Sequence, residues 1–169
     1  LARVLGEPGD LQARGRMQLG AAFAGVAIES SMLGAAHSAA NPLTAHFNVI
    51  HGRAVGLMLP HVMRFNCADP AAAHAYEDLA RAARIADNGD SAAVAAGALI
   101  ERVESLLNQA DIPRSAAECG VDAGSIPMLA AEAAAQWTAN FNPRKATEAD
   151  FIELYTKSMS PRRMNGDAY

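Results

Sequence analysis

Apolar residues recur at helical intervals early in the chain, and this pattern constrains the fold more than any other feature of the sequence. Within residues 11–40, one stripe steps by three and four through Leu19, Phe23, Val26, Ser30, Leu33 and His37. This spacing marks one face of an α-helix. Gly20, Gly25 and Gly34 each cost a helix about 1 kcal/mol relative to alanine, so we expect them where a neighbouring helix comes close. We therefore predict a central, tightly packed helix that ends at Asn41-Pro42, because the residue before a proline avoids the helical conformation.

The rest of the chain also favours helices over strands. Hydrophobic residues make up 51% and aromatic residues only 5% of the 169 residues, and alanine dominates. Alanine is the best helix former, and the β-branched residues that strands prefer are sparse. A chain of this length forms one ordinary domain. The prediction is an all-α fold, a helical bundle in a single domain over residues 1–169.

Local signals predict the later helices. A second helix covers residues 51–66 and is apolar on nearly every side, so we expect it to be buried, with a kink at Pro60. Asp69-Pro70 supplies a cap and a first-turn proline for a helix to Ala86. Three more elements follow: a helix from Ser91 to Gln109, one capped by Ser125 that reaches Trp137 or Asn140, and one opened by a Thr147 and Asp150 capping box, before a tail from Ser160 that we expect to fray.

Charge and cysteine content exclude several classes of protein. The net charge of −4 is spread thinly, with no basic block, so we expect no nucleic-acid partner. Cys67 and Cys119 form neither a C-x-x-C motif nor a disulfide scaffold, which favours a reducing cytoplasm. The longest apolar region, residues 19–36, is interrupted by Glu29, so we expect no membrane span. No Walker loop and no G-x-G-x-x-G motif after a strand occurs, so these residues alone do not encode a nucleotide site.

The stretch HSAANPLTAHFNVIHG places His37, His46 and His51 close together in the sequence. Imidazole binds divalent metals, and a hairpin between two helices can bring His37 and His51 to one point. Their spacing differs from the usual helical ligand pairs, so spacing alone leaves metal ligands and buried or capping histidines both open. We expect His46 to be a solvated or packing residue of the loop.

Three other ionisable residues receive simpler interpretations. His61 lies in the predicted buried helix, where a hydrogen bond in the core is the favoured role. His74 lies on an alanine-rich surface helix and carries no functional signal. Glu29 is about 80° around the helix axis from His37, and we interpret it as a surface charge rather than a carboxylate that supports a ligand.

Two long segments resemble a known family. The segments are GAAFAGVAIESSMLGAAHSAANPLTAHFNVIHGRAVGLMLPHVMRFN and NPRKATEADFIELYTKSM. In order and motif they are similar to the C-terminal helical domain of the iron-containing (group III) alcohol dehydrogenases, whose fold is that of the dehydroquinate synthase-like proteins. The family patterns are HPLGAxxxxPHG followed by xANAxLLPHVxxFN, and a closing NPRxxTxxDxxxLYxxA. The resemblance covers residues 20–159.

The resemblance implies a metal site that this chain holds only in part. His37 and His51 would be two of the four ligands of one Fe²⁺ or Zn²⁺ ion. The other two ligands in the family, an Asp and a His four residues later, lie some sixty residues earlier and would precede Leu1. The N-terminal nucleotide-binding domain would precede it as well. We therefore expect a fragment of a longer enzyme, with weak metal binding and no activity on its own.

Asn41, His46 and Ile50 depart from the family pattern. Many members have a His at the position of Asn41, close to the nicotinamide and the substrate. Asn41 is thus our candidate for cofactor contact, but an amide cannot pass on a proton. His46 could partly substitute in that role and is our only candidate catalytic residue. Ile50 replaces the usual proline before the second ligand.

The activity that the resemblance implies is hydride transfer between a small alcohol or aldehyde and NAD or NADP, with the metal polarising the alcohol oxygen. The family also implies a homodimer. Phe23, Leu33 and Phe47 are our guesses for the pocket wall. Two alternatives stay open: a non-catalytic helical module from a truncated gene, and a related activity such as glycerol dehydrogenase or maleylacetate reductase. The LPHVMRFN and NPRKAT segments favour the alcohol dehydrogenase branch.

Overall fold

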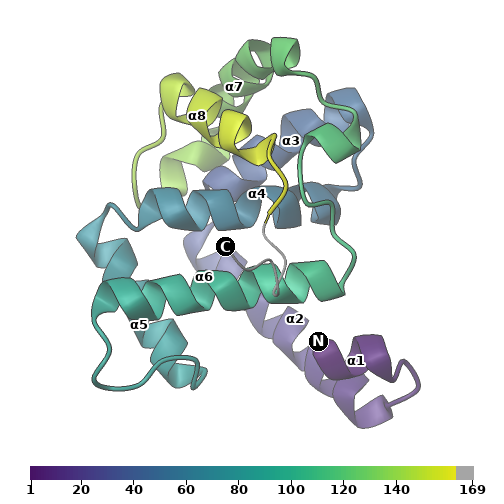
Figure 1. The fold of residues 1–169 in the computed structure, drawn as a ribbon, viewed down its shortest axis with the longest axis vertical. Helices are drawn as coiled ribbons and strands as arrows, with labels where there is room; N and C mark the ends of the chain where they lie inside the picture. The colour runs from purple at the N-terminus through teal and green to yellow at the C-terminus, as the bar shows by residue number, and fades with distance from the viewer. Residues whose placement is uncertain (163–169) are drawn as a thin grey trace.

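A computed structural model describes residues 1–162 of the chain, and these residues form helices and loops without a strand (Figure 1). The predicted all-α fold is therefore confirmed for the described part of the chain. The elements are α1 (Ala2–Gly6), α2 (Leu11–Ser31), α3 (Ala35–Phe47), α4 (His51–Asn66), α5 (Pro70–Ala82), α6 (Ala92–Gln109), the 3-10 turns η1 (Ala117–Cys119) and η2 (Ala123–Ser125), α7 (Ile126–Ala135), the 3-10 helix η3 (Trp137–Phe141) and α8 (Glu148–Ser158).

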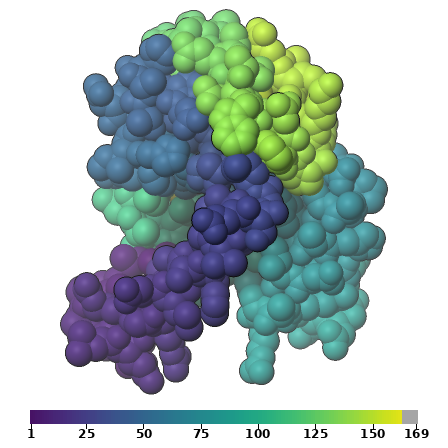
Figure 2. Space-filling view, turned by 180° about the vertical axis from the view of Figure 1, so that it is seen from behind, coloured from purple at the N-terminus to yellow at the C-terminus, as the bar shows by residue number. Residues whose placement is uncertain are grey.

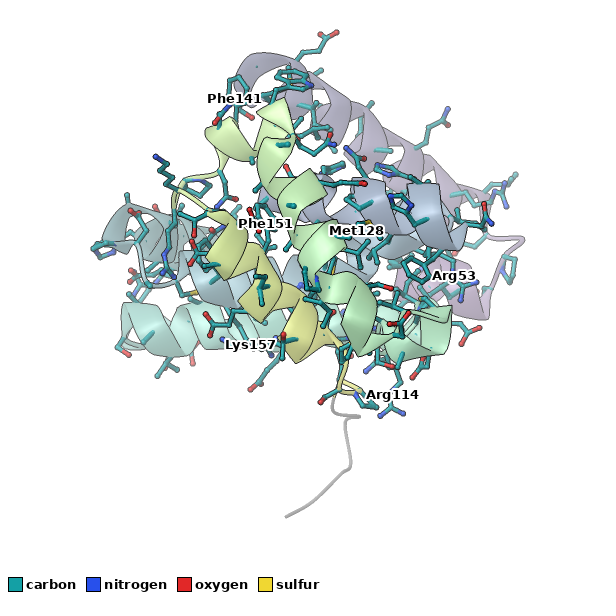
Figure 3. The ribbon with its side chains drawn as sticks, turned by 90° about the horizontal axis from the view of Figure 1, so that it is seen from above. Arg53, Arg114, Met128, Phe141, Phe151 and Lys157 are labelled. Atoms are coloured by element: carbon teal, nitrogen blue, oxygen red, sulfur yellow. The ribbon has the colours of Figure 1, made fainter. Side chains whose placement is uncertain are left out.

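The core lies between α3, α4, α7 and α8, and the α5–α6 hairpin packs beside α4. Figure 3 looks down on α7 and α8, which lie side by side, with Phe151 turned toward the interior. The largest fully buried side chains of this core are Tyr155, Phe151, Leu43, Leu57, Met58 and Leu129. Burial of each apolar side chain contributes roughly 2 kcal/mol, so packing fixes how these four helices lie relative to one another.

The predicted long helix to Asn41-Pro42 is wrong. The chain leaves α2 at Met32, which has a φ of 72°, and α3 then continues through Pro42 to Phe47. The axes of α2 and α3 are bent by 106° at this break. Proline removes a backbone hydrogen bond inside a helix, but Pro42 is fully buried. Tertiary packing therefore outweighs the local signal at Pro42.

The predicted tight packing of the first helix is also wrong, because no residue of α2 is buried. Leu19, Phe23 and Val26 are 55%, 66% and 63% exposed. A Cβ atom added at Gly20 or Gly25 would meet nothing within 4 Å. Figure 2 shows the N-terminal segment, in purple, projecting at the lower left of the molecule, where α1 contacts α6. The apolar stripe of α2 is thus uncovered in this structure.

The bounds of α4, α5 and α6 follow the sequence closely. α4 has the predicted bounds and is largely buried, as expected. The side chains of Asp69 and Ser91 cap α5 and α6 as predicted. α5 ends four residues early, because Arg84 takes a φ of 56° and the Ile85 N–H bonds back to the Ala80 carbonyl.

The predicted cap of α7 and its predicted end at Trp137 or Asn140 are both wrong, whereas the start of α8 is as predicted. Ser125 occupies the position before α7 but its side chain caps nothing there, and Asp122 instead accepts from the Ser125 N–H. α7 stops at Ala135 because Gln136 is extended, and η3 follows. The capping box of Thr147 and Asp150 is confirmed.

The tail that we expected to fray begins in an ordered segment. Arg162 is buried, and its guanidinium donates to the carbonyl oxygens of Pro113 and Ile112. Fraying is therefore wrong for Arg162, and residues 163–169 lie outside the described residues. Within residues 1–162 no single helix has the length and apolar composition needed to cross a membrane, and only the bent pair α2 and α3 meets both conditions together.

Candidate metal centre

His37 and His51 lie against each other in the structure. His37 is the third residue of α3 and His51 is the first residue of α4. Their ring centroids are 5.5 Å apart, and the ring planes are tilted by 48°. The connection between the helices is residues 48–50, beginning at Asn48 with a φ of 52°, so it is shorter than the predicted loop. The two imidazoles meet as the hairpin argument expected, and their role as ligands stays a prediction.

The surroundings of His37 favour the neutral imidazole. Burial lowers the pKa of His37, and the neighbouring His51 lowers it further. A neutral imidazole offers the lone pair that a metal ion needs, whereas an imidazolium ion does not. At neutral pH the ring of His37 is therefore in the form that can bind a metal.

Contacts from distant segments hold α3 beside this pair. Ser38 and Thr138 share a buried hydrogen bond of 2.8 Å. The Tyr155 hydroxyl donates to the Ala39 carbonyl oxygen at 2.7 Å. Sequence reasoning missed Thr138 and Tyr155 as supports of α3, although Tyr155 lies in the NPRKATEADFIELYTKSM segment that carries the family resemblance.

Asn41 follows His37 by one helical turn and lies on the same face of α3. Its Nδ2 donates to Oε1 of Gln136 at 3.0 Å. Gln136 is the extended residue between α7 and η3, and no sequence signal pointed to it. Two amides in such a pair leave one donor group and one acceptor group unused in either orientation. The pair can therefore bind a polar ligand without changing charge.

The placement of His46 in a loop is wrong, because His46 lies in the last turn of α3. Its Nε2 is 2.9 Å and 3.0 Å from the two carboxylate oxygens of Glu132. Both side chains are substantially exposed, and the pair links α3 to α7. A role of His46 in proton transfer would have to use the other ring nitrogen or break this contact.

The remaining candidates lie apart from the histidine pair or outside the core. Nε2 of His61 is buried without a hydrogen-bond partner, so the predicted core hydrogen bond is wrong for this nitrogen. His74 is exposed and contacts Glu77 on the surface of α5. Glu29 is exposed on α2, in agreement with a surface charge. Among the described residues no group of three or more His, Cys, Asp or Glu side chains could hold a metal ion.

Comparison with known proteins agrees with the family resemblance of the two sequence segments. The model of the family described as "Fe-containing alcohol dehydrogenase family, C-terminal" matches residues 1–159. Lactaldehyde reductase of Escherichia coli K12 is 39% identical over 147 residues, which cover 87% of this chain and 38% of that protein. A 1-propanol dehydrogenase of Citrobacter freundii is 35% identical over 148 residues, which cover 85% of this chain and 40% of that protein.

Solved structures have the same fold. A 1,3-propanediol oxidoreductase superposes with a TM-score of 0.87 at 28% identity, over 93% of this chain and 41% of that one. An alcohol dehydrogenase from Oenococcus oeni gives a TM-score of 0.85 at 28% identity, over 93% of this chain and 40% of that one. This chain therefore spans 38% to 41% of the length of these relatives.

Proposed function

This chain belongs to the Fe-containing alcohol dehydrogenase family, and from that premise we propose that it is the metal-binding helical part of an NAD- or NADP-dependent alcohol dehydrogenase. The reaction in this proposal is hydride transfer between a small alcohol or aldehyde and the nicotinamide. The observation that carries the proposal is the contact between His37 and His51 across the α3–α4 connection.

The two histidines fit a site for Fe²⁺ or Zn²⁺. Both ions accept imidazole nitrogen, and a ring-centroid separation of 5.5 Å allows both rings to approach one ion. The lowered pKa of His37 keeps its lone pair available at neutral pH. When bound, the ion supplies Lewis-acid polarisation of the alcohol oxygen.

This chain's residues hold only one side of the site. Catalytic sites of this type use three or more protein ligands, and no third candidate ligand joins His37 and His51 within residues 1–162. We place the remaining ligands, an Asp and a His by resemblance to the family, in polypeptide outside this chain. The chain alone then binds metal weakly and does not turn over substrate.

Asn41 is our proposed contact to the nicotinamide or to the substrate. Its bond to Gln136 holds the amide one turn from His37, where it can orient a polar group by hydrogen bonding. Asn41 does not titrate, so proton release needs another group, and His46 is the speculative candidate. Because Nε2 of His46 already contacts Glu132, we propose His46 only as a secondary candidate for proton transfer.

The substrate class follows from the relatives. Their printed names refer to lactaldehyde, 1-propanol and 1,3-propanediol, so a short-chain alcohol or aldehyde is the proposed substrate. These names favour an alcohol dehydrogenase over the glycerol dehydrogenase and maleylacetate reductase alternatives. A homodimer and a cytoplasmic location remain part of the proposal.

A chimera tests this function. Residues 1–159 of this chain replace the matched segment of E. coli lactaldehyde reductase, and lactaldehyde reduction is measured with NADH and NADPH. We expect activity that His37→Ala or His51→Ala lowers by about a hundredfold or more, while the exposed control His74→Ala leaves it unchanged. A folded chimera that is inactive from the start would favour the non-catalytic helical module. Activity that survives His51→Ala would instead contradict the role of His51 as a metal ligand.

A further inference from the structure

The side chain of Asn142 lies where three segments of the chain meet. Its Oδ1 accepts from the Ala35 N–H at 3.2 Å, and its Nδ2 donates to Oδ1 of Asn66 at 2.7 Å and to the Arg144 carbonyl oxygen at 2.6 Å. Asn142 is 9% exposed and Asn66 is 3% exposed. We call these three hydrogen bonds the Asn142 clasp.

The clasp caps α3 from a distant part of the chain. The first N–H groups of a helix lack partners within the helix, and the residue before α3, Gly34, has no side chain to cap them. Asn142 supplies the acceptor for Ala35 from 107 residues away. A Cβ atom at position 34 would lie 3.0 Å from Oδ1 of Asn142, so glycine leaves the space that the clasp needs.

The clasp also joins the helices of the two histidines. His37 follows Ala35 by two residues in α3, and Asn66 is the last residue of α4, which begins at His51. The loop that carries Asn142 is held on α4 in turn. The Arg144 guanidinium lies 3.8 Å from the centroid of the Phe65 ring and donates to the Phe65 carbonyl oxygen at 2.8 Å.

These contacts unite the LPHVMRFN and NPRKAT segments, which the metal site itself does not use. α2 leaves α3 at a bend of 106° and is exposed, so α2 does not fix where α3 starts. The hydrogen bonds of Asn142 with Ala35 and Asn66 instead hold the first turn of α3 in place. A shift of this turn would move His37 relative to His51.

We propose that Asn142 is a positioning residue for the His37–His51 pair, acting through Ala35 and Asn66. The inference rests on the proposed metal site for its functional meaning. The ring contact itself can be measured without metal, so the two ideas can fail separately.

The experiment uses the full 169-residue chain. The first measurement is the NOE between ring protons of His37 and His51 in metal-free protein, and the second is Co²⁺ affinity from visible absorption. Asn142→Ala removes the clasp. Asn142→Asp keeps the acceptor for the Ala35 N–H but loses both Nδ2 donations and turns a carboxylate oxygen toward the Asn66 and Arg144 oxygens, so it breaks the clasp at nearly constant side-chain size.

Two controls separate positioning from general stability. Asn140→Ala changes an exposed amide in η3, the 3-10 helix that directly precedes Asn142. Ile100→Ala removes a buried side chain from α6, far in sequence from both histidines, and destabilises the fold without touching the clasp. If Asn142→Ala does not fold, Gly34→Ala perturbs the clasp from its other side.

We expect Asn142→Ala, or Gly34→Ala in its place, to lose the NOE and to weaken Co²⁺ binding by about tenfold or more. Asn142→Asp, which lacks the two Nδ2 donations, should lose both signals as well, and the two controls should keep both. The proposal is overturned if the clasp variant retains the NOE, or if Ile100→Ala loses it equally. If the clasp variants lose the NOE but His51→Ala leaves the Co²⁺ affinity unchanged, the positioning role of Asn142 is supported and the proposed metal site is contradicted.

Discussion

The hydroxyl of Tyr155 in α8 donates a hydrogen bond of 2.7 Å to the carbonyl oxygen of Ala39 in α3. Tyr155 is fully buried, and burial raises the pKa of its hydroxyl. This bond ties the closing helix of the chain to the helix that carries His37. We expect Tyr155→Phe to lower the free energy of unfolding by about 1 kcal/mol, because only the hydrogen bond is lost. Urea unfolding measures this change.

A larger truncation at the same site gives the matched comparison. Tyr155→Ala also removes a buried ring and should cost about 3 to 5 kcal/mol. Equal stabilities of the wild type and Tyr155→Phe would show that the hydroxyl does not hold α3.

The buried ring of His61 should make the fold acid-sensitive. Burial lowers the pKa of His61, and together with a smaller effect of the nearby Arg64 it brings this pKa to about 4. The unfolded chain binds this proton near pH 6.5, so stability is complete above that pH and is lost as the pH falls toward 4. The loss attributable to His61 approaches about 3 kcal/mol.

Urea unfolding at pH 7 and pH 4.5 checks this prediction. The difference between the two pH values should shrink in His61→Gln, while the exposed control His74→Gln should keep it. A wild-type-like pH dependence in His61→Gln would mean that other groups cause the acid sensitivity.

The uncovered apolar stripe of α2 should drive self-association. Leu19, Phe23 and Val26 share one exposed face, and large exposed apolar patches mark interaction sites. We expect the chain to associate as its concentration rises and Phe23→Asp to reduce this association. Substitution of an exposed residue should change stability by less than about 0.5 kcal/mol.

Sedimentation velocity over a range of concentrations measures the association. Asp78→Asn, an exposed change of the same size in charge on α5, is the control. A wild-type chain that stays monomeric throughout would contradict the prediction.

The sequence predicts elements whose signals are local. The caps at Asp69, Ser91 and Thr147 lie within three residues of the N–H groups that they bind. The bounds of α4 follow from a segment in which apolar residues lie on nearly every side of the helix. All residues that make up such a signal lie in a short stretch of sequence, so helix propensity and capping rules are sufficient to predict these helix bounds.

The break between α2 and α3 depends on residues far along the chain. Asn142 caps Ala35 from 107 residues away, and burial offsets the hydrogen bond that Pro42 cannot make. For the same reason the sequence predicts a loop at His46, although this residue lies in the last turn of α3. No local pattern at residues 32–47 contains this information.

The candidate site shows the same division. The hairpin argument and the family resemblance brought His37 and His51 together, and the structure places their rings in contact. Gln136, Thr138 and Asn142 were missed because each reaches α3 from about a hundred residues away, between α7 and α8. An amide or a hydroxyl does not by its type indicate a structural role, although Asn142 opens the NPRKAT segment that carries the family resemblance.

The metal content of the chimera with lactaldehyde reductase tests the central claim most directly. Iron and zinc are measured in the purified chimera, in His37→Ala, in His51→Ala and in the control His74→Ala. We predict that each ligand variant loses at least about tenfold of the bound metal and that the control retains it. Unchanged metal in a folded His51→Ala chimera would contradict the assignment of His37 and His51 as ligands.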